Sequence, residues 1–177
     1  MRILLAALVA FAPQIALAAG GDDDEPPKST KTTTECEEGE VWDEKTEECV
    51  EAEDSSLNDD QRFGAVRELA YAGRPDQAIA VLATMTEGET SRVLTYRGFL
   101  LRQTGQIEEG IAAYERAIAI DPANVLARSY YGQLLVQMNE LELAQAQLSE
   151  IRAHGGTGTW AETALSTAIA TGVTYTF

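Results

Sequence analysis

Apolar and small residues recur at helical spacing along the second half of the chain, and the pattern repeats. From Ser91 to Asn124 they outline two helices joined by a turn at Gly105. The second helix is expected to stop at Pro122, because a residue before proline is disfavoured in the α region. Residues 125–158 repeat the design, with Asn139 in place of Gly105, and asparagine also tolerates a left-handed helix end. The pattern therefore predicts consecutive helix pairs.

The spacing within residues 91–124 is specific enough to indicate a family. Positions 4, 8, 11, 15, 20, 24, 27 and 32 of this 34-residue unit are Leu94, Gly98, Leu101, Gly105, Gly110, Tyr114, Ala117 and Pro122. The arrangement closely resembles the tetratricopeptide repeat signature. Small residues at Gly98 and Gly110 would let the two helices approach closely, and Tyr114 would fill the space between them. The resemblance implies an all-α solenoid of helix-turn-helix units, with about three helix pairs and a C-terminal capping helix.

We expect this repeat domain to cover residues 57–172. A degenerate first repeat spans about 59–90, and its second helix is clipped; the fuller repeats span 91–124 and 125–158. Thr159 and Glu162 form a capping-box pair that starts a lone helix over residues 159–172, which would cover the last apolar face of the solenoid. Residues 173–177, with the sequence VTYTF, are expected to form a short extended tail packed on this cap helix.

Residues 1–18 have the pattern of a secretory signal peptide. Arg2 gives a positive start, an apolar run too short to span a bilayer follows, and Ala16 to Ala18 supplies small residues for cleavage. We therefore expect an exported protein, periplasmic or secreted, with no membrane insertion after the signal is cleaved.

Charge divides the remaining chain near residue 57. Residues 19–60 carry 17 acidic residues against three lysines, whereas residues 61–177 carry 12 acidic residues against nine arginines. Residues 19–56 are thus predicted to be an acidic, low-complexity tail, and Gly20 to Thr34 has too few apolar residues to bury a core and should be disordered. This charge disfavours nucleic acid and anionic membranes as partners, because phosphate binding needs clustered cations.

Cys36 and Cys49 are the only cysteines of the chain. Their spacing does not fit a Cys-x-x-Cys redox motif, and two cysteines are too few ligands for a structural zinc site, so no metal is expected. An exported protein matures in an oxidising compartment, which favours a Cys36–Cys49 disulfide around a small hairpin. The loop resembles one cysteine loop of the peritrophin chitin-binding type over about 15 residues. Carbohydrate binding through Trp42 is kept as an alternative function.

The tetratricopeptide resemblance also implies a concave groove lined by the first helix of each pair. The matching positions hold aromatic residues, arginines and glutamines: Arg67, Tyr71, Arg92, Tyr96, Phe99, Arg102, Gln103, Tyr130, Gln133 and Gln137. Such a groove implies a protein or peptide partner, and its arginines would suit an acidic one. The competing interpretation is that Phe99 and Tyr71 are packing residues and that the arginines pair with nearby glutamates.

No set of residues typical of an enzyme is found. His154 is the only histidine, and it stands at an expected helix end, where it can favour the helix dipole. We therefore expect a non-enzymatic adaptor or scaffold without cofactors that binds a partner polypeptide in its groove. An alternative is that the acidic tail lies across the groove and regulates access to it. No feature of the sequence sets an oligomeric state.

Overall fold

The computed structural model describes residues 29–175, so the predicted signal peptide lies outside the described residues. Two short strands, β1 (Glu40–Asp43) and β2 (Glu48–Glu51), precede seven helices in this part of the chain. The helices are α1 (Asp59–Tyr71), α2 (Pro75–Ala83), α3 (Ser91–Gln103), α4 (Ile107–Ile120), α5 (Val125–Gln137), α6 (Leu141–Ala153) and α7 (Trp160–Thr171). None of these helices is long and apolar enough to cross a membrane.

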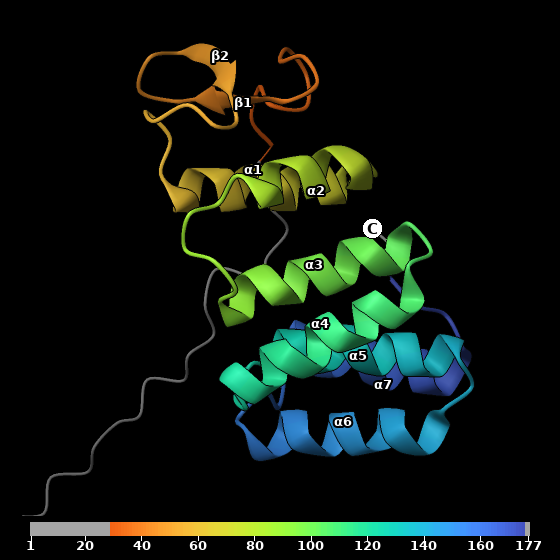
Figure 1. The fold of residues 1–177 in the computed structure, drawn as a ribbon. Helices are drawn as coiled ribbons and strands as arrows, with labels where there is room; N and C mark the ends of the chain where they lie inside the picture. The colour runs from red at the N-terminus through yellow and green to blue at the C-terminus, as the bar shows by residue number, and fades with distance from the viewer. Residues whose placement is uncertain (1–28, 176–177) are drawn as a thin grey trace, which may run out of the picture.

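The helices stack as pairs, α1 with α2, α3 with α4 and α5 with α6, and α7 packs on the last pair (Figure 1). The first helices of successive pairs also contact one another, α1 with α3 and α3 with α5, and α5 continues this series to α7. This arrangement is the predicted all-α solenoid of three helix pairs with a capping helix. The hairpin lies at one end of the stack.

The helix boundaries coincide with capping residues and with residues of positive φ. Asn58 and Gln61 form a complete capping box at the start of α1, and Thr159 accepts a hydrogen bond from the backbone N–H of Glu162 at the start of α7. After the first helix of a pair, Gly105 has a φ of 82° and Asn139 a φ of 63°, so both occupy the left-handed region expected at these ends.

Two glycines set the closest helix approaches. A Cβ added to Gly98 would lie 2.8 Å from ring carbons of Tyr114, so α3 and α4 could not pack as closely with a larger residue there. A Cβ added to Gly132 would lie 2.5 Å from the Leu165 side chain. The absence of a side chain at Gly132 therefore allows close contact between α5 and α7 in the same way. The expectation that small residues allow close helix contact is therefore confirmed.

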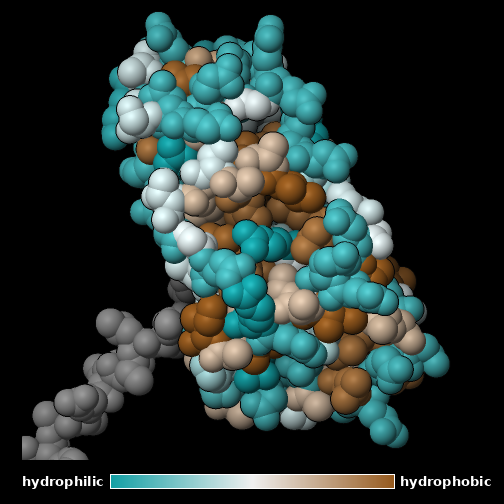
Figure 2. All heavy atoms as spheres, in the orientation of Figure 1, coloured by the Kyte–Doolittle hydropathy of each residue, from teal (hydrophilic) through white to brown (hydrophobic). Residues whose placement is uncertain are grey.

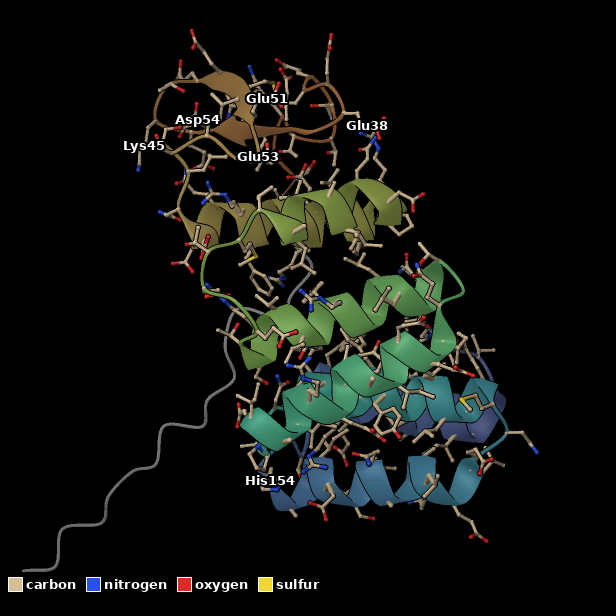
Figure 3. The ribbon with its side chains drawn as sticks, in the orientation of Figure 1. Glu38, Lys45, Glu51, Glu53, Asp54 and His154 are labelled. Atoms are coloured by element: carbon tan, nitrogen blue, oxygen red, sulfur yellow. A yellow bond between two sulfur atoms is a disulfide. The ribbon has the colours of Figure 1, made fainter. Side chains whose placement is uncertain are left out.

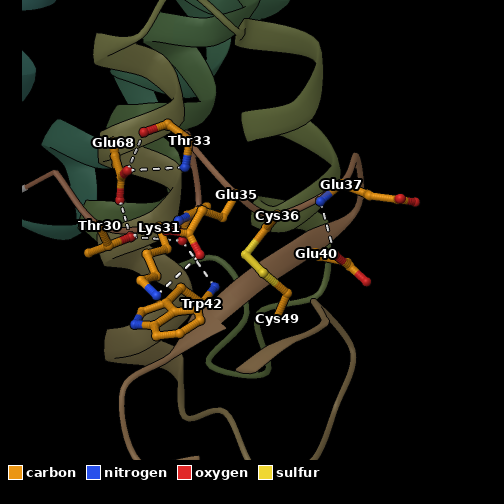
Figure 4. The surroundings of a disulfide bond; sticks show 11 residues. Thr30, Lys31, Thr33, Glu35, Cys36, Glu37, Glu40, Trp42, Cys49 and Glu68 are labelled. Atoms are coloured by element: carbon orange, nitrogen blue, oxygen red, sulfur yellow. Dashed lines mark hydrogen bonds and ion pairs between the residues drawn. A yellow bond between two sulfur atoms is a disulfide. The ribbon is translucent and has the colours of Figure 1, made fainter. Parts of the chain in front are cut away.

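The cysteine loop forms the expected hairpin, closed by a disulfide. Strands β1 and β2 pair antiparallel, with Trp42 opposite Cys49, and the Cys36–Cys49 bond ties the segment before β1 to β2 (Figure 4). The hairpin surface is largely hydrophilic, whereas apolar patches appear over the helices (Figure 2). Its carboxylates, Glu38, Glu51, Glu53 and Asp54 among them, are drawn in Figure 3.

This hairpin is joined to the solenoid by a buried contact. Val41, Ala52 and Leu57 belong to the same apolar core as residues of α1. Arg62 of α1, which is 5% exposed, donates hydrogen bonds of 2.8 Å to the backbone carbonyls of Ala52, Asp54 and Leu57. The second half of the acidic segment is thus a cap on the first helix pair.

The prediction of disorder up to Thr34 is wrong for the residues from Thr30 onward. Glu68 of α1 accepts hydrogen bonds from the Thr30 hydroxyl and from both the hydroxyl and the backbone N–H of Thr33. Arg74 donates to the Thr33 carbonyl at 3.0 Å. This stretch has no apolar residues with which to form a core. It is held in place by hydrogen bonds from threonine hydroxyls to a buried carboxylate.

Candidate functional site

Aromatic side chains form a row along the helices that begin each pair. The rings of Phe63 (α1) and Tyr96 (α3) have centroids 5.1 Å apart, and Tyr96 is 6.2 Å from Tyr130 (α5). Phe99 of α3 is 4.7 Å from Tyr130, and Tyr130 is 5.9 Å from Trp160 at the start of α7. We call the side of α1, α3, α5 and α7 that carries this row the inner face.

Most of the row is buried. Tyr96, Phe99 and Tyr130 are 3%, 0% and 1% exposed. Desolvation by this burial, with Tyr96 close by, raises the pKa of Tyr130 well above its ordinary value. Tyr96, Phe99 and Tyr130, which were predicted to line the groove, therefore lie close together. Their burial also agrees with the alternative in which such rings are packing residues.

The chain's own C-terminal segment lies against the inner face. Gly172, with a φ of 73°, ends α7 in the left-handed conformation, and the residues after it turn back over α5 and α3. The backbone N–H of Tyr175 donates to Gln133 Oε1 at 2.8 Å, and its carbonyl accepts from Arg102 Nη2 at 3.3 Å. Gln137 Nε2 donates to the Thr174 hydroxyl at 2.7 Å. The predicted tail is present, and it reaches beyond the cap helix.

An aromatic contact adds to these hydrogen bonds. The Tyr175 ring lies 5.6 Å from the Trp160 ring, so the segment extends the aromatic row by one member. Trp160, Thr174 and Tyr175 were not among the predicted groove residues. The alternation in VTYTF and the capping-box start at Thr159 marked their elements, but the approach of the tail to α3 and α5 depends on residues about 40 to 70 positions apart.

Arg102 is a buried cation that contacts the C-terminal segment. It is 6% exposed, and its Nε donates to Gln137 Oε1 at 2.9 Å. Desolvation lowers the pKa of Arg102 from its ordinary value, while the adjacent Tyr114 opposes that change. Within the described residues, Arg102 Nη1 and the Tyr114 hydroxyl have no hydrogen-bond partner. A buried guanidinium with unused hydrogen-bonding capacity favours an electron-rich neighbour such as a peptide carbonyl.

The other predicted arginines differ in their surroundings. Arg92 forms ion pairs with Glu87 and Asp60, at 2.7 Å each, and lies over the Phe63 ring. The hydrogen bond to Glu87 is the main cause that raises the pKa of Arg92. Arg92 therefore matches the alternative in which arginines pair with nearby acids. Arg67 donates to the Tyr96 hydroxyl at 3.3 Å.

Tyr71 and Gln103 stand near the edges of the predicted set. Tyr71, the last residue of α1, is 49% exposed, and Gln103 is half-buried at the end of α3. The structure thus brings Arg102, Gln133 and Gln137 together around one segment of chain. A partner-binding role for any of the predicted residues stays a prediction.

Candidates for other chemistry are engaged in structural contacts. His154 is the C-cap residue of α6, as expected, and lies 3.5 Å from Glu150 (Figure 3). Ligand atoms of Cys36, Glu40 and Cys49 lie within 4.8 Å of one another, but the two sulfurs are bonded to each other. The Lys31 ammonium lies over the Trp42 ring at 4.4 Å (Figure 4).

The comparisons with known proteins agree with the helix arrangement. The family model described as tetratricopeptide repeat matches residues 101–159, which run from the end of α3 to the start of α7. A search of curated proteins and a search of solved structures each returned no match. Tetratricopeptide repeats generally mediate protein–protein interaction and are typically non-enzymatic modules. Residues 101–159 thus match the tetratricopeptide repeat family, and the helix pairs of the rest of the solenoid have the arrangement that such repeats adopt.

Proposed function

We propose that this protein is an exported, non-enzymatic adaptor that binds a partner polypeptide along its inner face. The single observation that carries the proposal is that this face already holds a stretch of the chain itself, residues 173–175. Gln133 and Arg102 bind the main-chain N–H and carbonyl of Tyr175, groups that any peptide offers. The export of the protein is supported by the sequence pattern of residues 1–18 alone.

The charge of the inner face favours an acidic partner. Arg102 is buried, and none of the ion pairs among residues 29–175 involves it. A carboxylate-bearing peptide would gain a charge-assisted interaction at the Arg102 guanidinium, so we expect its affinity to fall as salt is raised.

The two alternatives have weaker support. Residues 30–56 of the acidic segment dock on α1 through Arg62 and Glu68, which favours a capping role over that of a lid for this part. Lys31 covers one side of the Trp42 ring, which leaves less of that ring for stacking on a sugar.

Capture of partners from a periplasmic fraction tests the proposal. We would compare the parent chain with Tyr71→Ala and Gln137→Ala, which change exposed side chains at predicted groove positions, and with Leu143→Ala as the control. Leu143 is 53% exposed on α6, outside the inner face. The proposal expects partner recovery to fall in the first two variants and to stay unchanged in the control. Equal recovery with all four chains would remove the inner face from the function.

A further inference from the structure

Residues 173–175 contact the inner face through hydrogen bonds and one ring contact. The hydrogen bonds are with Gln133, Arg102 and Gln137, and the ring contact is with Trp160. Val173 is 68% exposed and Tyr175 is 41% exposed. The buried core of α5, α6 and α7 contains none of residues 173–175, so these residues can leave the face while the helices keep that core.

The inner face contacts main-chain groups, which any peptide has, and also side chains of the segment. The Tyr175 amide and carbonyl are main-chain groups, and the Thr174 hydroxyl is the acceptor for Gln137. The Tyr175 ring is the one bulky group, and it contacts Trp160 in a tilted arrangement of the kind that favours aromatic pairs. Main-chain hydrogen bonds give a peptide affinity, and a side-chain contact of this kind gives it specificity.

We propose that residues 172–175 are a built-in occupant of the inner face, which a partner must displace with an extended segment that presents an aromatic side chain to Trp160. This inference rests on the proposed function and names the kind of segment that the adaptor accepts. The tether makes the tail an effective competitor, because an attached segment acts at an effective concentration of about 1 mM. For a tail whose own dissociation constant from the open face is about 100 μM, this effective concentration weakens the binding of any competing ligand to the full chain roughly 10-fold.

The displacement can be measured with a synthetic peptide in place of a partner. A fluorescein-labelled peptide of residues 171–177 is titrated by anisotropy. The receptor is either the full chain or a chain shortened to end at Gly172, and circular dichroism checks that both keep their helices. We expect binding to the shortened chain and roughly 10-fold weaker binding to the full chain.

Variants test the named contacts. The peptide with Tyr175→Ala should bind the shortened chain at least about fivefold more weakly, because the loss of an aromatic pair is worth about that factor. Val173→Ala is the matched control, since Val173 is exposed, and this peptide should bind like the parent. The full-length chain carrying Tyr175→Ala should bind the parent peptide with an affinity between those of the other two chains, and it retains every helix residue.

Three results would overturn the inference: no binding to the shortened chain, equal binding to the shortened and full chains, or equal binding of the parent peptide and the peptide carrying Tyr175→Ala. The assay needs no partner from the cell. A failure of partner capture with intact peptide displacement would therefore count against the proposed function alone, and the reverse result would count against the built-in occupant alone.

Discussion

Replacement of Gly98 by alanine tests the closest helix contact of the central repeat. A new Cβ would lie 2.8 Å from two ring carbons of Tyr114, which is 0% exposed and has no room to move freely. Gly64, on the exposed side of α1, is the matched control, because a Cβ there meets nothing within 4 Å. Alanine in place of either glycine gains up to about 1 kcal/mol of helix propensity.

The propensity gain is common to both sites, so the difference between the two variants isolates the packing penalty. Overpacking a core typically costs about 1–3 kcal/mol. We therefore expect Gly64→Ala to stabilise the protein and Gly98→Ala to be less stable than Gly64→Ala by about 1–3 kcal/mol, which is the overpacking cost alone. Urea unfolding followed by circular dichroism measures both free energies of unfolding.

A double-mutant cycle identifies the cause of the penalty. In a Tyr114→Leu background the ring is gone, and the cost of Gly98→Ala relative to Gly64→Ala should largely vanish. If Gly98→Ala were as stable as Gly64→Ala in the parent chain, or if the penalty persisted without the Tyr114 ring, the reasoning about the close approach of α3 and α4 would be refuted.

Three further predictions concern the hairpin and the start of α1. Arg62→Met should release the hairpin at a cost on the order of 3 kcal/mol, because three carbonyls lose a charged donor; hydrogen exchange should then rise in residues 40–51, and unchanged exchange would contradict the docking. Replacing Cys36 and Cys49 by serine should cost about 3 kcal/mol relative to the oxidised parent in the chain-entropy model of loop closure, and unfolding of the reduced parent should show the same loss. Equal stability of the serine variant and the oxidised parent would argue against a stabilising bridge. Partial burial alone would raise the pKa of Asp59, but hydrogen bonds from Thr86 and the backbone of the following residue hold the pKa below its ordinary value. The ionised carboxylate thus adds stability above the unfolded pKa of about 3.9 and loses it as the pH falls. The stability deficit of Asp59→Asn should be full at pH 7 and shrink below about pH 4, and a deficit independent of pH would exclude this origin.

Local signals predicted most of the helical part of the fold. Gly105 and Asn139 marked helix ends because each can adopt a positive φ, and Gly98 marked a close contact because it has no side chain. Each of these is a property of one residue in a repeating frame, so sequence alone carries it.

Contacts between segments that are far apart in the sequence could not be predicted from such local signals. The order of Thr30 and Thr33 depends on Glu68, about 35 positions away, and a polar threonine stretch gives no sign of which carboxylate it will meet. The docking of Tyr175 on Arg102 likewise joins residues 73 positions apart. The list of inner-face residues could be written from the repeat frame, but their burial could not.

One measurement tests most directly whether the inner face holds a displaceable polypeptide segment. Isotope-labelled full chain is examined by NMR for cross-peaks between ring protons of Trp160 and Tyr175, whose centroids are 5.6 Å apart. The spectrum is then repeated with excess unlabelled peptide of residues 171–177. We predict cross-peaks within the labelled chain that disappear as the peptide takes the place of its tail. The absence of these cross-peaks in the free chain, or their survival at saturating peptide, would contradict the account.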